Sequence, residues 1–569
     1  MRKTFKGTNQ TYKGSNGNDQ LTVKGSGNTV NAKSGKKDTI KIASGDYHTI
    51  NGGNGVDVIT VKKGNYHKIN GDKGNDKINL NNIGWNGSSW NDWGNKDLTH
   101  GGAGNDKIYV KAGRHEVHGD AGNDTITIFA QAQEYNVVYG EAGNDNITVK
   151  GSNYHTIYAG GSSKKGYDTI TIKGGTKTTV YGEGGVDKIT VTGGREHVLH
   201  GGEGKDQILI GSKIGAKNAD YIVVYGDEDA DKITVNVGDA HEINTGAGKD
   251  TVTINSGSGH VIRNKIDKWN EGFGGNDVVT INKKAGNNIS VEGINSSNET
   301  VKVYGGNDHS IGLGDGTNNV LIAGGKNHTI TTGNDKDVIT VQNQAHVLNI
   351  RTNGGNDVIT IKGGAYVNNN SNSYYNRSIQ TGSGDDQVTF NSDAGNGTWV
   401  KTEDGNDKIY VRGGKNLNVN AGEGIDTIEV TGGSDHRIDL ESGRNNVTLS
   451  AKNITMQMSN SADDRIAINW GTNRGLYTIY ATKNNSVATV DTLTINNAKK
   501  DSFTFTIEHA GYYYKNLLLT STNGSKILID YWACDGDPTS TSAKTSFSGI
   551  KFADGSLSFA TINKKAGWV

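Results

Sequence analysis

The chain alternates short apolar strands with polar, glycine-rich turns at a nearly constant spacing. In the segment VITV (58–61), the polar Thr60 separates Ile59 from Val61. Side chains alternate between the two faces of a β-strand, so Ile59 and Val61 are expected to face a core and Thr60 the solvent. A second short strand follows, with Ile69 as its inward residue. The pattern predicts two short strands and two turns in each repeat.

An acidic residue precedes the first strand of each repeat and marks the length of the repeat. Asp38, Asp57 and Asp76 hold this position in three successive repeats, 19 residues apart. Eleven of the intervals along the chain have this length. One repeat cannot bury its own apolar face, whereas stacked repeats bury a continuous core. The sequence therefore predicts an all-β fold, a parallel β-solenoid with about 19 residues per coil.

Composition agrees with a repeat protein and excludes several other classes. The 569 residues include 83 glycines, one proline and only 32% hydrophobic residues, which is typical of a thin, continuous core. The 59 basic and 60 acidic residues nearly cancel, which gives no electrostatic reason to expect a nucleic-acid partner. No apolar run is long enough to span a bilayer, and the N-terminal segment has no apolar signal sequence. The single cysteine, Cys534, excludes an internal disulfide framework.

The turns before the acidic residues have the composition of calcium sites. GGNGVD (52–57) and GGAGND (101–106) each combine glycines, whose carbonyls can point inward, with one carboxylate. Calcium takes six to eight oxygen ligands, so two turns on successive coils would share one ion. The predicted ligands are Gly52, Gly55, Asp57, Gly71, Gly74, Asp76, Gly101, Gly104, Asp106, Gly119, Gly122, Asp124, Gly140, Gly143, Asp145, Asp187, Asp206, Asp250, Asp386, Asp407 and Asp426.

The motif GGxGxDxUx, with U apolar, resembles the calcium-binding nonapeptide of repeats-in-toxin (RTX) proteins over roughly residues 14–450. The resemblance implies a β-roll that binds several Ca²⁺ ions, export by a type I system and folding outside the cell. Three features depart from that family. The motif occupies only one of the two turns of each coil, KSGKKD (33–38) and other turns are degenerate, and Asn318 and Asn445 replace the aspartate. Lysine pairing, or aspartate–backbone hydrogen bonds without ions, are the alternatives.

A histidine follows the acidic residue by ten positions in nine coils, on the opposite turn. A stack of imidazoles at this edge could bind a transition metal, respond to pH or contact a partner. The alternative is that each ring hydrogen-bonds a backbone carbonyl of its own turn. The nine residues are His48, His67, His155, His197, His241, His260, His309, His328 and His436.

Three long insertions carry aromatic residues that suit sugar rings or a protein partner. Beyond about residue 496 the period stops, and the phrase IKFADG (550–555) resembles the terminal segment of haemolysin-type calcium-binding proteins, which implies an uncleaved export signal. The expected domains are a solenoid over 1–495 and a capping and secretion segment over 496–569. The aromatic residues are Trp85, Trp90, Trp93, Trp269, Tyr374 and Tyr375.

These observations favour a secreted, calcium-binding structural or adhesive protein of the bacterial cell surface, such as a surface-layer or filament subunit that self-assembles. The sequence contains no HExxH, GxSxG or P-loop motif, so no enzyme is predicted. The alternatives are a polysaccharide lyase or epimerase with its site under the aromatic loops, and a glycan-binding module.

Overall fold

The computed structural model describes residues 2–81, 97–131, 135–161, 166–214, 219–264, 275–293, 297–367, 378–458, 463–471, 475–481, 491–509, 514–534 and 547–567. The predicted parallel β-solenoid is confirmed. Strand β7 (Val58–Val61) pairs in parallel with β5 (Thr39–Ile42) and β9 (Lys77–Leu80), which places Ile59 beside Ile40 and Ile78. The chain divides into two compact units, Met1–Glu292 and Gly293–Val569.

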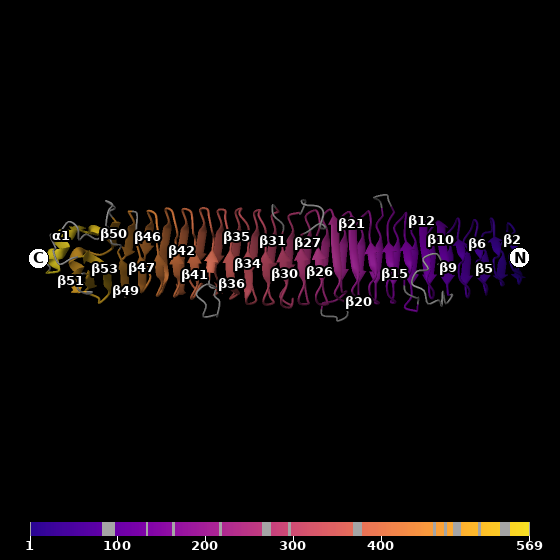
Figure 1. Cartoon of the computed structure of the whole chain (residues 1–569), viewed down its shortest axis with the longest axis horizontal. Coiled ribbons are helices and arrows are strands. Elements are labelled where there is room, and N and C mark those ends of the chain that lie inside the picture. The colour runs from indigo at the N-terminus through magenta and orange to yellow at the C-terminus, as the bar shows by residue number, and fades with distance from the viewer. Residues whose placement is uncertain are drawn as a thin grey trace. The chain divides into compact units, whose positions relative to one another are not determined.

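The first unit consists of coils that each contribute one strand to each of two parallel sheets (Figure 1). A further pair, β20 (Gly194–Arg195) and β23 (Ala219–Asp220), lies outside both sheets. The first sheet contains, besides β5, β7 and β9, the strands β1 (Arg2–Phe5), β3 (Gln20–Val23), β11 (Lys107–Val110), β13 (Thr125–Ile128), β15 (Asn146–Val149), β17 (Thr169–Ile172), β19 (Lys188–Val191), β22 (Gln207–Ile210), β25 (Lys232–Val235), β27 (Thr251–Ile254) and β29 (Val278–Ile281). The second contains β2 (Thr11–Lys13), β4 (Thr29–Asn31), β6 (Thr49–Asn51), β8 (Lys68–Asn70), β10 (Asp97–Ala103), β12 (His115–Ala121), β14 (Val137–Tyr139), β16 (Thr156–Tyr158), β18 (Thr179–Tyr181), β21 (Val198–Glu203), β24 (Val223–Glu228), β26 (Glu242–Asn244), β28 (Val261–Arg263) and β30 (Ser290–Glu292).

The second unit repeats this arrangement and then departs from it. Its first sheet contains β31 (Thr300–Val303), β33 (Asn319–Ile322), β35 (Val338–Val341), β37 (Val358–Ile361), β40 (Gln387–Phe390), β42 (Lys408–Lys415), β44 (Thr427–Ser434), β46 (Asn446–Leu449), β48 (Arg465–Asn469), β50 (Asp491–Asn496) and β54 (Phe547–Phe552). Its second contains β32 (Ser310–Gly312), β34 (His328–Thr331), β36 (His346–Arg351), β38 (Tyr366–Val367), β39 (Ser378–Gln380), β41 (Trp399–Lys401), β43 (Asn418–Asn420), β45 (Arg437–Asp439), β47 (Ile454–Gln457), β49 (Leu476–Tyr480) and β53 (Lys526–Cys534).

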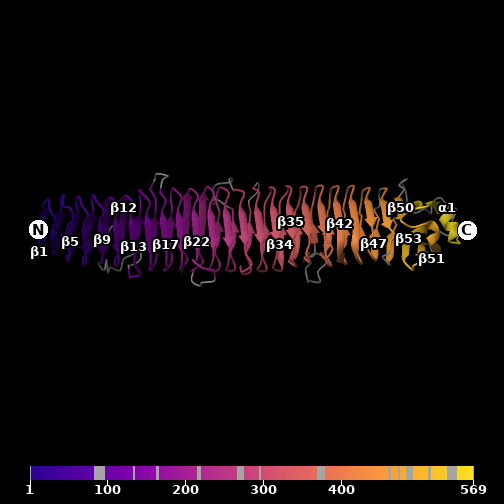
Figure 2. The same ribbon diagram turned by 180° about the vertical axis from the view of Figure 1, so that it is seen from behind.

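Antiparallel pairing enters the second unit only after β50, among the strands that the structure describes there. Strands β51 (Phe503–His509) and β52 (Tyr514–Ser521) pair with each other in antiparallel fashion, and β52 pairs likewise with β53. Strand β55 (Gly555–Ser558) pairs with β54, and it is followed by the short helix α1 (Phe559–Lys565). Figure 2 shows β51, β53 and α1 together at the C-terminal end of this unit.

The core of each unit is a narrow space between the two sheets. Strand β7 contributes Ile59 and Val61, and β8 contributes Ile69; Ile59 and Val61 are fully buried, and Ile69 is 1% exposed. The intervening Thr60 is only partly buried, as the alternation in the sequence predicts. Three inward apolar residues per coil explain how a chain with 32% hydrophobic residues can fold. Among the described residues, no helix has the length and apolarity that crossing a membrane requires.

Two glycines of the aspartate turn are required by the closeness of neighbouring coils. A Cβ on Gly119 would lie 2.5 Å from Oδ2 of Asp124 and 2.7 Å from the carbonyl oxygen of Gly140 on the next coil. Gly122 has a φ of 138°, and a Cβ there would lie 1.9 Å from the carbonyl oxygen of Gly104 on the preceding coil. At this turn the two glycines therefore allow the coils to stack, whether or not the turn binds a ligand.

We expect Gly119→Ala to lower the urea midpoint of unfolding, with a local cost of about 1–3 kcal/mol from overpacking. Gly312→Ala is the matched control, because a Cβ at Gly312 would meet no atom within 4 Å. The control should stay within about 0.5 kcal/mol of the wild-type protein. Equal effects of the two substitutions in urea denaturation followed by circular dichroism would contradict the steric explanation.

Candidate metal centres of the aspartate turn

The aspartates of the turn form a ladder of hydrogen bonds inside each unit. The backbone N–H of Asp57 donates to Oδ1 of Asp76 on the next coil, 2.6 Å away, and the N–H of Asp106 donates to Oδ1 of Asp124 at 2.7 Å. The ladder runs from Asp19 to Asp277 in the first unit and from Glu299 to Asp491 in the second. Each carboxylate thus replaces the backbone acceptor that the turn lacks.

The second carboxylate oxygen is buried and has no hydrogen-bond donor among the described residues. Buried oxygens of this kind are rare in proteins, because losing water without gaining a donor costs about 1–3 kcal/mol for each group. In the first unit this holds for Oδ2 of Asp38, Asp57, Asp76, Asp106, Asp124, Asp145, Asp168, Asp187, Asp206, Asp231 and Asp250.

A carbonyl oxygen of the next coil faces the same space as the carboxylate. The space that a Cβ on Gly101 would fill is bounded by Oδ2 of Asp106 at 2.6 Å and by the carbonyl oxygen of Gly119 at 2.7 Å. Gly71, Gly119, Gly140, Gly182, Gly201 and Gly226 have the same surroundings. Oxygen atoms from two successive coils therefore converge beside each of these glycines.

The two asparagine positions indicate which kind of group this space accepts. Asn318 takes the place of the aspartate in its coil, and its Oδ1 accepts the usual N–H from Glu299 at 3.0 Å. Its Nδ2 donates to the carbonyl oxygens of Gly314 and Gly316, both at 3.0 Å. Asn445 makes the equivalent contacts with its own turn. The side-chain atom at the position of Nδ2, which is Oδ2 in an aspartate, therefore faces carbonyl oxygens. A carboxylate oxygen without a proton cannot donate a hydrogen bond to them. An aspartate there needs a proton or a cation.

Burial changes the acidity of the aspartates accordingly. It raises the pKa of Asp57 and Asp76 to about 7, that of Asp124 to about 8 and that of Asp231 to about 9. Near neutral pH and without a cation, Asp124 and Asp231 favour the protonated form, and Asp57 and Asp76 exchange between the protonated and ionised forms.

The residues of the first unit fit a calcium ion in donor type, burial and charge. All the donors are oxygens, which is the preference of calcium. Each predicted aspartate ligand from Asp57 to Asp250 occupies the ladder. Gly52, Gly71, Gly101, Gly119 and Gly140 lie beside the carboxylates, and Gly55, Gly74, Gly104, Gly122 and Gly143 adopt positive φ at the tight approach between coils.

Several predicted turns of the second unit are built differently. Thr381 and Thr402 stand where the first unit has its first glycine, before Asp386 and Asp407 respectively. Their hydroxyls donate to carbonyl oxygens of the next coil, from Thr381 to Thr402 at 3.0 Å and from Thr402 to Ala421 at 2.7 Å. A side chain therefore fills the space that stays open in the glycine turns, as Thr245 also does before Asp250 in the first unit. The turns of Gly101, Gly119 and Gly140 are the better candidates for metal binding.

The histidine column is a second ladder, and the interpretation that its rings bond backbone carbonyls is confirmed for six of the nine residues, namely His48, His241, His260, His309, His328 and His436. Nδ1 of His241 accepts the backbone N–H of Ile222 at 3.1 Å, and Nε2 lies 3.0 Å from the carbonyl oxygen of Val237. The rings of His241 and His260 stack at 4.9 Å. Burial lowers the pKa of His260 to about 4. Because both ring nitrogens of His241 already have backbone partners, this imidazole is neutral and offers no lone pair to a metal.

A row of stacked rings that was not predicted from the sequence lies on the outer face of the second sheet. We call it the aromatic stripe, and its members are His100, His118, Tyr139, Tyr158, Tyr181, His200 and Tyr225. Most of them directly precede the first glycine of an aspartate turn, as in HGG (100–102) and YGE (139–141). That recurring position was the signal that could have revealed the stripe.

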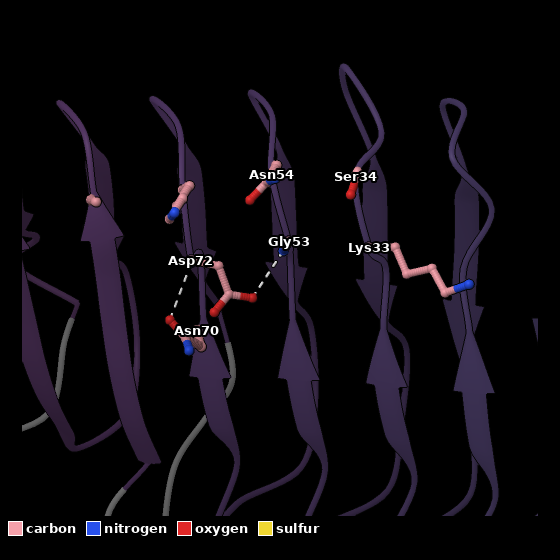
Figure 3. A pocket seen from close by; sticks show the side chains of 8 residues that line it. Lys33, Ser34, Gly53, Asn54, Asn70 and Asp72 are labelled. Carbon is pink, nitrogen blue, oxygen red and sulfur yellow. Dashed lines mark hydrogen bonds between the residues drawn. The ribbon is translucent and has the colours of Figure 1, made fainter.

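Carboxylates lie beside the aromatic stripe in four coils, two residues after a ring of the stripe: Asp120, Glu141, Glu183 and Asp227. Nδ1 of His100 lies 3.1 Å from Oδ1 of Asp120, which raises the pKa of the imidazole, and Nδ1 of His118 lies 2.7 Å from Oε1 of Glu141. Figure 3 shows the same position in an earlier coil, at the edge of a surface pocket. There Asp72 accepts the backbone N–H of Gly53 at 3.0 Å, and its own N–H donates to Asn70.

The aromatic residues predicted as a ligand or partner face lie outside the described residues: Trp85, Trp90, Trp93, Trp269, Tyr374 and Tyr375. No protein-family model matches the chain, and no curated protein matches it. The chemistry of the turns is therefore the basis for a functional proposal.

We expect His241→Ala to destabilise the protein more than His241→Asn. Alanine leaves the buried N–H of Ile222 without an acceptor, at a cost of about 1–3 kcal/mol. Asparagine restores one, as Asn136 does when it accepts the N–H of His115 at 2.7 Å. Urea denaturation of both variants is the measurement, and equal losses would show that the ring contributes only by its volume.

We expect the chelated protein to lose thermal stability between pH 7 and pH 9. A pKa raised above the unfolded value means that the folded state holds a proton that the unfolded chain releases, so stability falls as pH rises through the folded pKa. Asp124 at about 8 and Asp231 at about 9 titrate in this window. His241 and His260 of the column, whose pKa values burial lowers, stay neutral above pH 7 and contribute little. A melting temperature that rises over this range in chelator would contradict the assignment.

Proposed function

We propose that this chain is a secreted, calcium-binding structural or adhesive protein of the bacterial cell surface, whose folding is coupled to calcium. The observation that carries the proposal is the column of buried Oδ2 atoms without donors in the first unit. A divalent cation can compensate the carboxylate charge and bind the turn carbonyls at the same time.

The ions would be held by carboxylates and turn carbonyls of successive coils. Asp106, Asp124 and Asp145 supply the carboxylates of three adjacent turns, and Gly119 and Gly140 supply carbonyl oxygens that face them. When bound, calcium would neutralise the charge and bridge neighbouring coils, while Oδ1 keeps its hydrogen bond to the previous coil.

Binding restricted to the folded state contributes directly to folding. When the free calcium concentration is 100 times the dissociation constant of a site, that site adds about 2.7 kcal/mol to the free energy of unfolding. Calcium is abundant outside cells, which agrees with the export that the resemblance to RTX proteins implies. The chain would then fold where it acts, and its charge-balanced, β-rich surfaces would serve as scaffold or contact face.

The test is a calcium titration of chelated protein, followed by far-UV circular dichroism and light scattering. We expect β-structure or the melting temperature to rise steeply at roughly millimolar calcium, as is common for extracellular sites. Scattering that rises with it would support self-assembly. A protein that is fully folded in chelator and unchanged by calcium would overturn the proposal.

A combined variant, Asp106→Asn, Asp124→Asn and Asp145→Asn, tests whether the stabilisation by calcium arises at the aspartate turns. Asparagine keeps the ladder acceptor and supplies the amide that Asn318 places on its turn carbonyls, so the variant should fold in chelator. Its gain in melting temperature on adding calcium should be clearly smaller than that of the wild-type protein. Asp393→Asn, at an exposed position, is the control and should keep the full gain.

A further inference from the structure

The aromatic stripe begins with two histidines on adjacent coils. The rings of His100 on β10 and His118 on β12 stack at 4.5 Å with an interplanar angle of 18°. Their strands pair in register, so both imidazoles project from the same position of the coil. Unlike the buried histidine column, these side chains are partly exposed, 37% for His100 and 15% for His118.

Carboxylates surround this histidine pair. Asp120 lies 3.1 Å from Nδ1 of His100, and Glu141 lies 2.7 Å from Nδ1 of His118. Oε1 of Glu116 lies 3.4 Å from Nε2 of His118. One nitrogen from each histidine and one oxygen of Asp120 all lie within 4.8 Å of one another. Two ligands of a tetrahedral zinc ion are roughly 3.4 Å apart, so small side-chain rotations bring these three atoms to one ion.

The carboxylates occupy a backbone position that favours glycine. Asp120 and Glu141 have φ values of 69° and 70°, where the corresponding residues of other coils are Gly53, Gly102 and Gly202. A left-handed conformation costs a non-glycine residue roughly 1–2 kcal/mol. Such strain at a position near polar groups points to a role for the side chain.

Asp72 holds the same position as Asp120, but asparagines stand beside it where Asp120 has two histidines. Asp72 has the same left-handed conformation, φ 71°, and accepts a backbone N–H just as Asp120 accepts that of Gly102 at 3.0 Å. Its neighbours on the outer face of the sheet are Asn51 and Asn70 (Figure 3 labels Asn70). The backbone bond thus explains the aspartate in both coils, but it does not explain the paired imidazoles beside Asp120.

The stacking also decides which ligands the stripe can take. Sugar rings bind to the open faces of aromatic side chains, but here each face inside the stripe is covered by the next ring at 4.5–5.0 Å. What remains accessible is the edge of the rings, where imidazole nitrogens and carboxylate oxygens meet. That donor set suits a cation.

We propose that His100, His118 and Asp120 form a site for a divalent transition metal, with zinc as the reference ion. Imidazole nitrogens favour zinc, copper and nickel, whereas calcium prefers oxygen ligands alone. Glu141 is the nearest candidate for a fourth ligand. The ion would bridge β10 and β12 on the outer face of the sheet, and although Asp120 belongs to the turn of Gly119 and Asp124, the site shares no ligand with the proposed calcium sites.

The test is isothermal titration calorimetry of the full chain with Zn²⁺, in millimolar Ca²⁺ so that oxygen-only sites are occupied. We expect one site of about micromolar affinity or tighter. His118→Asn, and the double variant with His100→Asn, should weaken it at least tenfold, because each removes a nitrogen ligand. Asparagine at this position occurs naturally at Asn51 and Asn70, so the variants should fold; an unchanged circular dichroism spectrum checks this.

His200→Asn is the matched control. His200 lies in the same stripe and 3.2 Å from Asp227, but its ring neighbours are Tyr181 and Tyr225. Zinc affinity should be unchanged in this variant. The proposal is overturned if the wild-type chain shows no saturable zinc binding, if His118→Asn binds as tightly, or if His200→Asn loses the site. The calcium response of His118→Asn should equal that of the wild type, so failure of one proposal is distinguishable from failure of the other.

Discussion

The hydrogen bond from one backbone N–H to the aspartate of the next coil is the interaction on which the rest of the architecture depends. It fixes the acidic residue at the corner of the coil and brings it, with the backbone, into an interior that excludes water. Because Oδ1 is committed to that bond, Oδ2 must face the glycine turn. Three features follow from this one hydrogen bond: the raised pKa values of the aspartates, the need of Oδ2 for a proton or a cation, and the two glycines that allow neighbouring coils to approach closely.

At both edges of a coil a backbone N–H needs a hydrogen-bond acceptor, and the two edges supply different side chains. At one edge a carboxylate accepts the N–H, and at the other an imidazole accepts it through Nδ1 and uses Nε2 on its own turn. An imidazole such as that of His241 is neutral and has a backbone partner for both ring nitrogens, so it needs no ion. The carboxylate carries charge that its surroundings do not balance. The choice of acceptor therefore leaves only the aspartate edge in need of a proton or a cation, and the GGxGxD motif occurs on that edge only.

Much of the architecture could be predicted from the sequence, because the coil repeats a simple pattern. The spacing of Asp38, Asp57 and Asp76 and the alternation around Ile59 and Val61 determine the coil length, the register and the core. What the sequence could not give is the partner of each polar atom. The roles of Oδ1 and Oδ2, and the distinction between glycine turns and those with Thr381 or Thr402, depend on contacts between coils. His100 and His118 lie 18 residues apart, close to the regular interval, but both precede a glycine turn instead of following the acidic residue by ten positions, and their contact depends on the stacking of the two coils.

The direction of the aspartate ladder has a consequence for how such a chain assembles. In every described rung the donor belongs to the earlier coil and the acceptor to the later one, so a coil satisfies its own turn only when its successor arrives. In the first described rung, Ser15 replaces the donor that an earlier coil supplies elsewhere: its N–H and its hydroxyl both donate to the carboxylate of Asp19 at 2.8 Å. Growth of the stack is therefore vectorial, with a nearest-neighbour coupling of the kind that makes a one-dimensional array cooperative. A break at one rung would expose the N–H groups on one side and the carboxylates on the other, and the two fragments would differ in charge at the fracture.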